Sequence, residues 1–287
     1  MKKLAIWLGI LCWSCSGPRA DAAVHVKHYP WLADWSGALP LMVPLESRFP
    51  APSGYTRVKA EGFGAWLRGL PIRMDRQTVL SHSGDALSRP AAAIVALDVG
   101  AKNRQQCADT AYRLHAEYLW HSGLARKARY HFTSGDVSTY AAWLGGERFK
   151  IKGRGITRLS GRRRGHTHET FRQWLDHLFI YAGTRSVARD SVSVASYGAA
   201  QGGDVFVQGG SPGHAVIILD IVTDAAGRRL ALLGQGFMPA EDLHVLEAPW
   251  AVDDVWFPLE GAVQTPSWPS AFSLRDLRRF KTPDSTR

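Results

Sequence analysis

Apolar residues return at intervals of three and four along two stretches of the chain, and this period predicts amphipathic helices. The first stretch begins at Cys107, with Asn103 as the expected N-cap and Gly123 as the residue that ends the helix. The second covers residues 167–183 and has the clearest apolar face in the chain. Two shorter helices are expected at residues 63–71 and 135–146.

Continuous apolar runs, and alternation of apolar with polar residues, predict strands elsewhere. The expected strands lie at residues 91–99, 127–134, 203–210, 214–222, 229–237 and 254–261. The segment DAAGR separates the fourth strand from the fifth and has turn chemistry, so these two strands are expected to form a β-hairpin. The pattern as a whole predicts an α+β fold, in which the cysteine-bearing helix packs on an antiparallel sheet.

Two segments lack a clear period. Residues 24–55 are rich in Pro and Trp and predict an extended arm that packs on the body of the protein. Residues 147–165 are expected to form a basic loop, in which the run GRRRGH is solvated. The expected organisation is therefore a signal peptide at 1–22, an N-terminal arm at 23–75 and one α+β domain at 76–287.

The first residues have the pattern of a secretory signal peptide. Two lysines precede an apolar stretch of about 10 residues, and Ala20-Asp21-Ala22 then forms an A-x-A cleavage pattern. That stretch is too short to span a membrane, and no later segment approaches the roughly 20 apolar residues that a transmembrane helix needs. We therefore expect export to the periplasm or cell envelope. Lipidation at Cys15 is an alternative, although the residues before it fit a lipobox badly.

The composition is that of a folded, basic protein. Hydrophobic residues make up 45% of the 287 residues, which is enough for a sizeable core. The formal net charge is +10, and it is +8 once residues 1–22 are removed. A basic exported protein is suited to anionic envelope surfaces. No nucleic-acid-binding module is present in the sequence, so we expect no nucleic-acid partner, and no motif calls for a cofactor.

The cysteine count leaves two interpretations of Cys107 open. The chain has three cysteines, and cleavage after Ala22 removes Cys12 and Cys15. Cys107 is then a single cysteine in an oxidising compartment, without a partner for a disulfide. Such a residue is either a reactive thiol or a small buried hydrophobe.

Three residues form a candidate catalytic constellation. Cys107 lies at the start of a helix, where the helix dipole and the free backbone N–H groups favour the thiolate. His214 opens a strand after the loop GGSPG, and Gln235 lies near the end of the returning strand, roughly opposite. In this order the roles would be nucleophile, general base and the residue that orients the imidazole.

This order resembles that of papain-like thiol hydrolases, and of the CHAP and NlpC-like cell-wall amidases in particular. The segments that carry the resemblance are Gln105-Gln106-Cys107 and GGDVFVQGGSPGHAVIILDIV, about 50 residues together. The resemblance implies a papain-like core, an oxyanion hole formed by the Cys107 amide with Gln106 or Gln105, and a peptide or peptidoglycan-like substrate. Over nearly the whole mature chain, the sequence also resembles an uncharacterised family of exported bacterial proteins, which implies an envelope location and no activity.

The same residues allow other interpretations. A lone histidine on an apolar strand is commonly structural, and Gln235 is equally able to bond its own turn. His166 and His168 have the spacing of a weak metal site. The rival function is a non-catalytic envelope protein that binds glycan or a protein partner on an inherited hydrolase scaffold. It predicts a buried, inert Cys107 and a groove lined by Trp and Arg.

Overall fold

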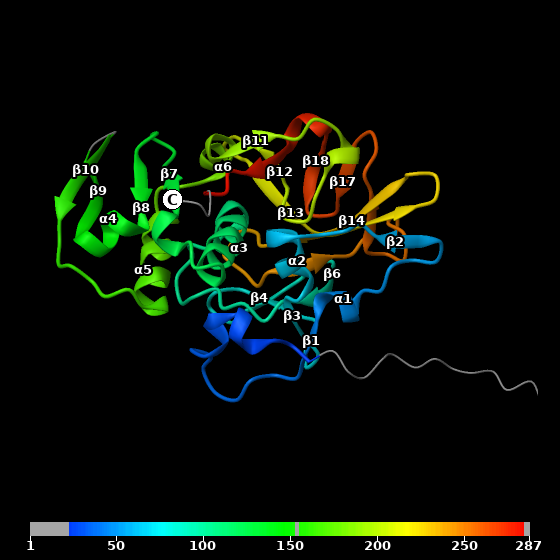
Figure 1. Ribbon diagram of the computed structural model, residues 1–287, viewed down its shortest axis with the longest axis horizontal. Coiled ribbons are helices and arrows are strands. Elements are labelled where there is room, and N and C mark those ends of the chain that lie inside the picture. The colour runs from blue at the N-terminus through cyan, green and yellow to red at the C-terminus, as the bar shows by residue number, and fades with distance from the viewer. Residues whose placement is uncertain (1–22, 153–154, 284–287) are drawn as a thin grey trace, which may run out of the picture.

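A nine-stranded sheet forms the centre of the protein in the computed structural model, which describes residues 23–152 and 155–283 (Figure 1). All of its pairings are antiparallel. In spatial order the strands are β11 (Ser191–Ser193), β19 (Leu277–Phe280), β12 (Val205–Gln208), β13 (His214–Asp224), β14 (Arg229–Gln235), β15 (His244–Leu246) and β6 (Ala91–Ile94). Beside this path, β16 (Trp256–Pro258) pairs with β14, and β2 (Tyr55–Arg57) pairs with β13.

Helices and small two-stranded sheets surround this sheet. The helices are α1 (Leu45–Arg48), α2 (Gly62–Arg68), α3 (Cys107–His121), α4 (Tyr140–Gly145), α5 (His168–Leu178) and α6 (Thr184–Asp190). The small sheets pair β1 (Met42–Pro44) with β3 (Pro71–Arg73), β4 (Val79–Leu80) with β5 (Ala86–Leu87), β7 (Arg129–His131) with β8 (Val137–Thr139), β9 (Glu147–Lys152) with β10 (Gly155–Ser160), and β17 (Val263–Thr265) with β18 (Trp268–Phe272).

The two faces of the large sheet are covered by different parts of the chain. Side chains alternate between the faces along a strand, so Ala215 and Val216 of β13 belong to separate apolar clusters. Helix α3 covers the face of Ala215 and contributes Ala108 to the same cluster. The β17–β18 hairpin covers the other face and contributes Phe272 to the cluster of Val216.

Helix α3 lies close against the sheet because small residues meet at the contact. A Cβ atom placed on Gly236, just after β14, would come within 2.5 Å of the Thr110 hydroxyl on α3. Most of the helix is buried, including charged residues in its middle turns. Figure 1 shows α3 between the large sheet and a second layer that contains β7–β10, α4 and α5.

The predicted α+β class is confirmed. The elements predicted at 63–71, 91–99, 167–183, 203–210, 229–237 and 254–261 are present with shorter bounds, whereas β13 extends two residues beyond the strand predicted at 214–222. The predicted loop at 147–165 is wrong, because most of it forms the β9–β10 hairpin. Its basic residues alternate with Ile and Leu on two largely exposed strands, so their charge concealed the strand pattern. The helix predicted over 135–146 begins only at Tyr140, because β8 occupies the residues before it.

The N-terminal arm is more ordered than its sequence indicates. It contains two short 3₁₀ helices, η1 (Val26–His28) and η2 (Pro30–Leu32), and strand β1. Trp31 anchors it, because the indole N–H donates a hydrogen bond of 2.6 Å to the Ala96 carbonyl. The predicted signal peptide at 1–22, with Cys12 and Cys15, lies outside the described residues. Within the described ranges, no helix has the length and apolar character needed to cross a bilayer.

Candidate functional site

Cys107 is the first residue of α3, and the residue is only 7% exposed. Gln106 is the N-cap in place of the predicted Asn103, whose side chain instead accepts a hydrogen bond from the Ala240 amide. Burial, with a smaller contribution from Asp109, raises the pKa of the Cys107 thiol to about 11, even though the Ala215 amide donates to the sulfur. The thiol is therefore neutral at ordinary pH, which is opposite to the activated thiolate of a nucleophile.

A cavity of about 550 Å³ opens beside this thiol, and we call it the Cys107 cavity. Residues of the first turn of α3 and of the segments 179–184 and 210–213 line it. Gln106 also lines it, with its side-chain amide donating to Asn103. Gln105 does not reach the cavity, because its side chain is fully buried against Arg113 on the other side.

His214 and Gln235 are in contact. The His214 Nε2 atom lies 2.8 Å from the Gln235 side-chain oxygen, and both residues are buried. The imidazole packs against the rings of Phe237, Trp268 and Phe272. Burial lowers the pKa of His214 to about 4, so the ring is neutral at ordinary pH.

The imidazole and the thiol lie on opposite sides of β13. The His214 ring contacts Phe272, which belongs to the cluster on the face of the β17–β18 hairpin. Cys107 sits at the end of the helix that covers the other face, next to the Ala215 amide. The structure thus brings His214 to Gln235 but does not direct its ring toward Cys107.

The two histidines of the weak metal pattern both pack against Trp120, but their polar partners differ. His166 packs on Trp120 and lies 3.2 Å from the Tyr140 hydroxyl. His168 instead contacts two carboxylates, Glu117 and Asp34. Among residues 23–152 and 155–283, no group of three or more His, Cys, Asp or Glu side chains has an arrangement able to hold a metal ion.

A larger cavity, of about 890 Å³, lies between the N-terminal arm and helices α3 and α5, and we call it the arm cavity. The arm supplies aromatic and polar residues to one wall, and the two helices supply charged residues to the other. The lining residues are Trp31, Asp34, Trp35, Ser36, Ala38, Pro40, Arg73, Asp75, Asp98, Arg113, His168, Glu169, Arg172 and Gln173.

Arg113 is the centre of the charged wall. Its side chain is fully buried and bonds Asp98 at 2.7 Å and Glu117 at 2.7 Å. Arg172 also contacts Asp98, at 3.3 Å. Burial alone would raise the pKa of the Asp98 carboxyl, but the two guanidinium groups outweigh it and lower that pKa below its ordinary value. Asp98 is therefore an ionised carboxylate held in a fixed position at the wall.

His168 links this wall to the arm. Its Nε2 atom lies 2.9 Å from buried Glu117, and its Nδ1 atom lies 3.3 Å from Asp34 of the arm. Burial lowers the pKa of His168, but the hydrogen bond and charge of Glu117 outweigh this and raise it above the ordinary value. The protonated ring is thus favoured where the two carboxylates meet.

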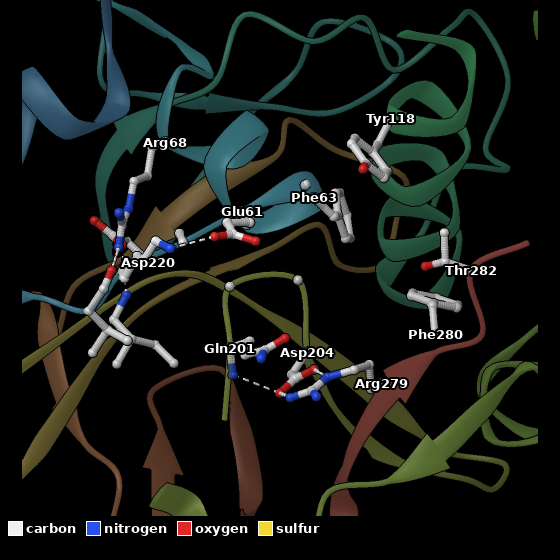
Figure 2. Close-up of a pocket in the computed structure, with 18 residues that line it drawn as sticks. Glu61, Phe63, Arg68, Tyr118, Gln201, Asp204, Asp220, Arg279, Phe280 and Thr282 are labelled. Atoms are coloured by element: carbon white, nitrogen blue, oxygen red, sulfur yellow. Dashed lines mark hydrogen bonds and ion pairs between the residues drawn. The ribbon is translucent and has the colours of Figure 1, made fainter. Parts of the chain in front are cut away.

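A third cavity, shown in Figure 2, also has an accessible carboxylate, that of Glu61, whose side chain is 75% exposed and pairs with Lys59. There Asp220 is bonded by Arg57 and Arg68, and Asp204 by Arg279, and both carboxylates are only 1% exposed. Their hydrogen-bonding capacity is used within the fold. In the arm cavity the Asp98 side chain is 40% exposed and that of Asp34 is 67% exposed, so these carboxylates retain acceptor positions for a ligand.

The rival function predicted a groove lined by Trp and Arg, but the sequence did not give the place of the arm cavity or the residues that line it. One signal was present: Arg113 and Glu117 stand four residues apart in a helix with a strong apolar pattern, the spacing at which opposite charges pair. The other wall left no signal, because Trp31 and Trp35 come from a segment without a period.

Residues 45–279 match the family described as Domain of unknown function (4846), and the chain belongs to this family. The match covers most of the chain and includes Cys107, Arg113, His214 and Gln235. Neither the curated proteins nor the solved structures include a significant match. The papain-like resemblance therefore stays a prediction, and the family carries no activity to transfer.

Proposed function

We propose that the protein is a non-catalytic binding protein of the cell envelope that holds a neutral oligosaccharide in the arm cavity. The proposal rests on the charged wall of this cavity. Asp98 is held in place by Arg113 and Arg172, yet its side chain is 40% exposed, and Trp35 lines the same cavity. A sugar presents hydroxyl groups to polar side chains and an apolar ring face to aromatic ones. The cavity offers both kinds of surface.

Charge balance in the cavity favours a neutral ligand. Four carboxylates and three guanidinium groups line it, and His168 adds a fourth cation when protonated. These charges are largely paired with one another, so they create little net field to select an anion or a cation. The overall charge of +10 therefore does not decide what this cavity binds. It is consistent with attraction to anionic envelope surfaces elsewhere on the molecule.

The aromatic part of the cavity is supplied by the arm. Trp35 is half-buried, and the Arg73 guanidinium lies 5.7 Å from the centre of its ring. Trp31 is almost fully buried and supports the base of the cavity. A volume of about 890 Å³ lies within the range of about 300–1,000 Å³ typical of ligand pockets. The export expected from residues 1–22 would place this cavity in contact with cell-wall glycan.

Isothermal titration calorimetry with tetra-N-acetylchitotetraose tests the proposal. We expect saturable binding that Trp35→Ala and Asp98→Asn each weaken at least tenfold. Trp250→Ala is the matched control, because Trp250 is 52% exposed and lies outside the cavity, and it leaves the affinity unchanged. Heparin serves as a charged control, and it should not displace the chitotetraose from the arm cavity. Absence of binding to this and to other neutral glycans, or equal losses in the control variant, would contradict the proposal.

The thiol hydrolase is the second candidate, and one observation favours it. Cys107 lines a cavity at the N-terminus of a 15-residue helix, where a substrate carbonyl would meet backbone N–H groups. We rank it second because the thiol is buried and neutral and the His214 ring faces the other side of β13.

A further inference from the structure

The β9–β10 hairpin packs on the protein with one face only. Phe149 belongs to the main apolar cluster, and Ile156 packs against that cluster. Side chains alternate between the two faces along a strand, and directly paired residues lie on the same face. The residues that alternate with Phe149 and Ile156 therefore form the opposite face, which we call the outer face. Its side chains are those of Arg148, Lys150, Lys152, Thr157 and Leu159, and all but Arg148 are exposed.

Positive charge dominates this part of the chain. Residues 147–152 and 155–166 contain seven Lys or Arg residues and a single acidic residue, Glu147. Glu147 lies on the face of Phe149 and pairs with Arg158 at 3.0 Å, so it is not paired with a cation of the outer face. Within the described part of the hairpin, the outer face therefore has no acidic side chain, and its charge attracts anions.

A second group of cations lies beside the outer face. The loop at 161–165 contains three consecutive arginines, which are all exposed. Arg148 helps to hold this loop, because its guanidinium donates a hydrogen bond of 3.3 Å to the Arg162 carbonyl and lies 3.5 Å from the centre of the Trp143 ring. Burial lowers the pKa of Arg148 from its ordinary value, and the nearby charge of Arg164 lowers it further. The hairpin and the loop thus form one basic surface.

Two apolar side chains are exposed next to these cations. Leu159, on the outer face, is 46% exposed, and Ile151, near the end of β9, is 57% exposed. Figure 1 shows the hairpin at one end of the long axis of the molecule. A soluble polyanion would pair with the cations but leave Leu159 in water. A bilayer of anionic lipids accommodates both, because lysine side chains reach the headgroups while apolar groups enter the acyl boundary.

We infer that the outer face of the β9–β10 hairpin, together with the arginine loop at 161–165, docks on bilayers that contain anionic phospholipids. Each Lys or Arg held near an anionic membrane strengthens binding about fivefold, and this contribution weakens as salt screens the charges. Insertion of Leu159 adds an apolar contribution. The surface is separate from the arm cavity, so membrane docking and glycan binding can be tested independently.

Cosedimentation with lipid vesicles tests this inference. The protein is used without residues 1–22, which is the form expected after export, because their apolar stretch would itself bind lipid. Vesicles of phosphatidylcholine alone are compared with vesicles of equal parts phosphatidylcholine and phosphatidylglycerol. We expect a partition coefficient at least about tenfold higher on the anionic vesicles, and this preference should shrink as salt is added. Equal binding to the two kinds of vesicle, or no binding to either, overturns the inference.

Charge variants separate docking by the hairpin from attraction of the whole basic protein. Lys150→Gln/Lys152→Gln should lower the partition coefficient on anionic vesicles about 25-fold, because each cation contributes about fivefold. Lys59→Gln/Arg228→Gln is the matched control and should change the coefficient little. It removes the same charge from side chains that are 88% and 71% exposed, beside β2 and β14, which Figure 1 shows well away from the hairpin. Equal losses in the two double variants overturn the inference.

An apolar variant separates a lipid bilayer from other polyanions. Leu159→Ser should lower the partition coefficient at least about threefold, because the inserted side chain is lost. Leu39→Ser is the matched control, because Leu39 is 44% exposed and lies outside the hairpin, and it should leave the coefficient unchanged. An unchanged coefficient in Leu159→Ser, beside a loss in the lysine variant, would identify a surface that binds polyanions of any kind, and it overturns docking on lipid.

Discussion

The imidazole of His168 lies against the buried carboxylate of Glu117, with Nε2 2.9 Å from the nearer oxygen. His168 begins α5 and Glu117 lies in the third turn of α3, so the contact joins the two helices that form the charged wall of the arm cavity. The other ring nitrogen reaches Asp34, which belongs to the arm. One titratable side chain therefore ties three segments of the chain together.

The stabilisation that His168 provides through these two contacts should depend on pH. The folded-state pKa of His168 is raised above its ordinary value of about 6.5, so its stabilising contribution is fully present below that value and is lost as pH rises through the folded-state pKa. The free energy of unfolding of the wild type, compared with that of His168→Gln, should show an advantage at pH 6 that shrinks toward pH 9. Urea denaturation at both values measures it. An advantage that is constant with pH would contradict the raised pKa.

Removing the buried cation at the centre of the wall should be strongly destabilising. Arg113→Met leaves Glu117 buried without its guanidinium partner, and breaking a buried ion pair in this way costs about 3–5 kcal/mol. The double variant Arg113→Met/Glu117→Leu should recover part of the loss, because it removes the uncompensated charge. Arg228→Met, in an exposed ion pair with Asp224, is the control and should change stability little. Chemical denaturation of all four proteins gives the comparison.

His214 should have no influence on the reactivity of Cys107. Its ring lies on the far side of β13, among aromatic rings, so His214→Phe keeps an aromatic side chain there while it removes the imidazole and its hydrogen bond with Gln235. We expect the pH dependence of Cys107 alkylation to be the same in the variant and the wild type, with an apparent pKa near 11. A thiol hydrolase predicts the opposite outcome, namely fast labelling well below the ordinary thiol pKa of about 8.5 that drops in the variant.

Gly203 should be intolerant of a side chain. Its φ is +95°, and a Cβ atom there would collide with the ring of Phe63, so Gly203→Ala combines backbone strain with a clash. We expect a loss of about 2–4 kcal/mol in the free energy of unfolding. Gly227 is the matched control, because its φ is +80° and an added Cβ atom would meet no neighbour, and its replacement by Ala should cost about 1 kcal/mol. Equal losses of unfolding free energy at the two positions would contradict this prediction, because they would show that the Phe63 ring moves aside at little cost.

Periodic segments were predictable from the sequence because their pattern lies within a short stretch of chain. The apolar spacing of α3 and α5 and the turn between β13 and β14 are properties of short windows, which hydrophobic periodicity reports directly. The β9–β10 hairpin was missed because basic side chains fill its exposed positions. An arm that packs on the body was expected, but its short helices and strand were not, because its order comes from distant partners, such as the hydrogen bond from Trp31 to Ala96.

The candidate site shows the same limit. The predicted hairpin correctly placed His214 close to Gln235. It did not predict on which face of the sheet the two side chains lie. A bulge between Ile218 and Asp220 shifts the register, and a change of one residue moves side chains to the opposite face. Sequence order alone could therefore place a histidine near Cys107 along the strand without deciding which side of the sheet its ring occupies.

The two walls of the arm cavity lie differently with respect to the family match. The family match begins at residue 45, whereas Trp31, Asp34 and Trp35 all precede it. The shared domain provides the rigid, charged half of the cavity, and a segment outside the shared region provides the aromatic half. Replacement of residues 23–44 would therefore change the aromatic lining, whereas the pairing of Arg113 with Asp98 and Glu117 lies wholly within the matched range.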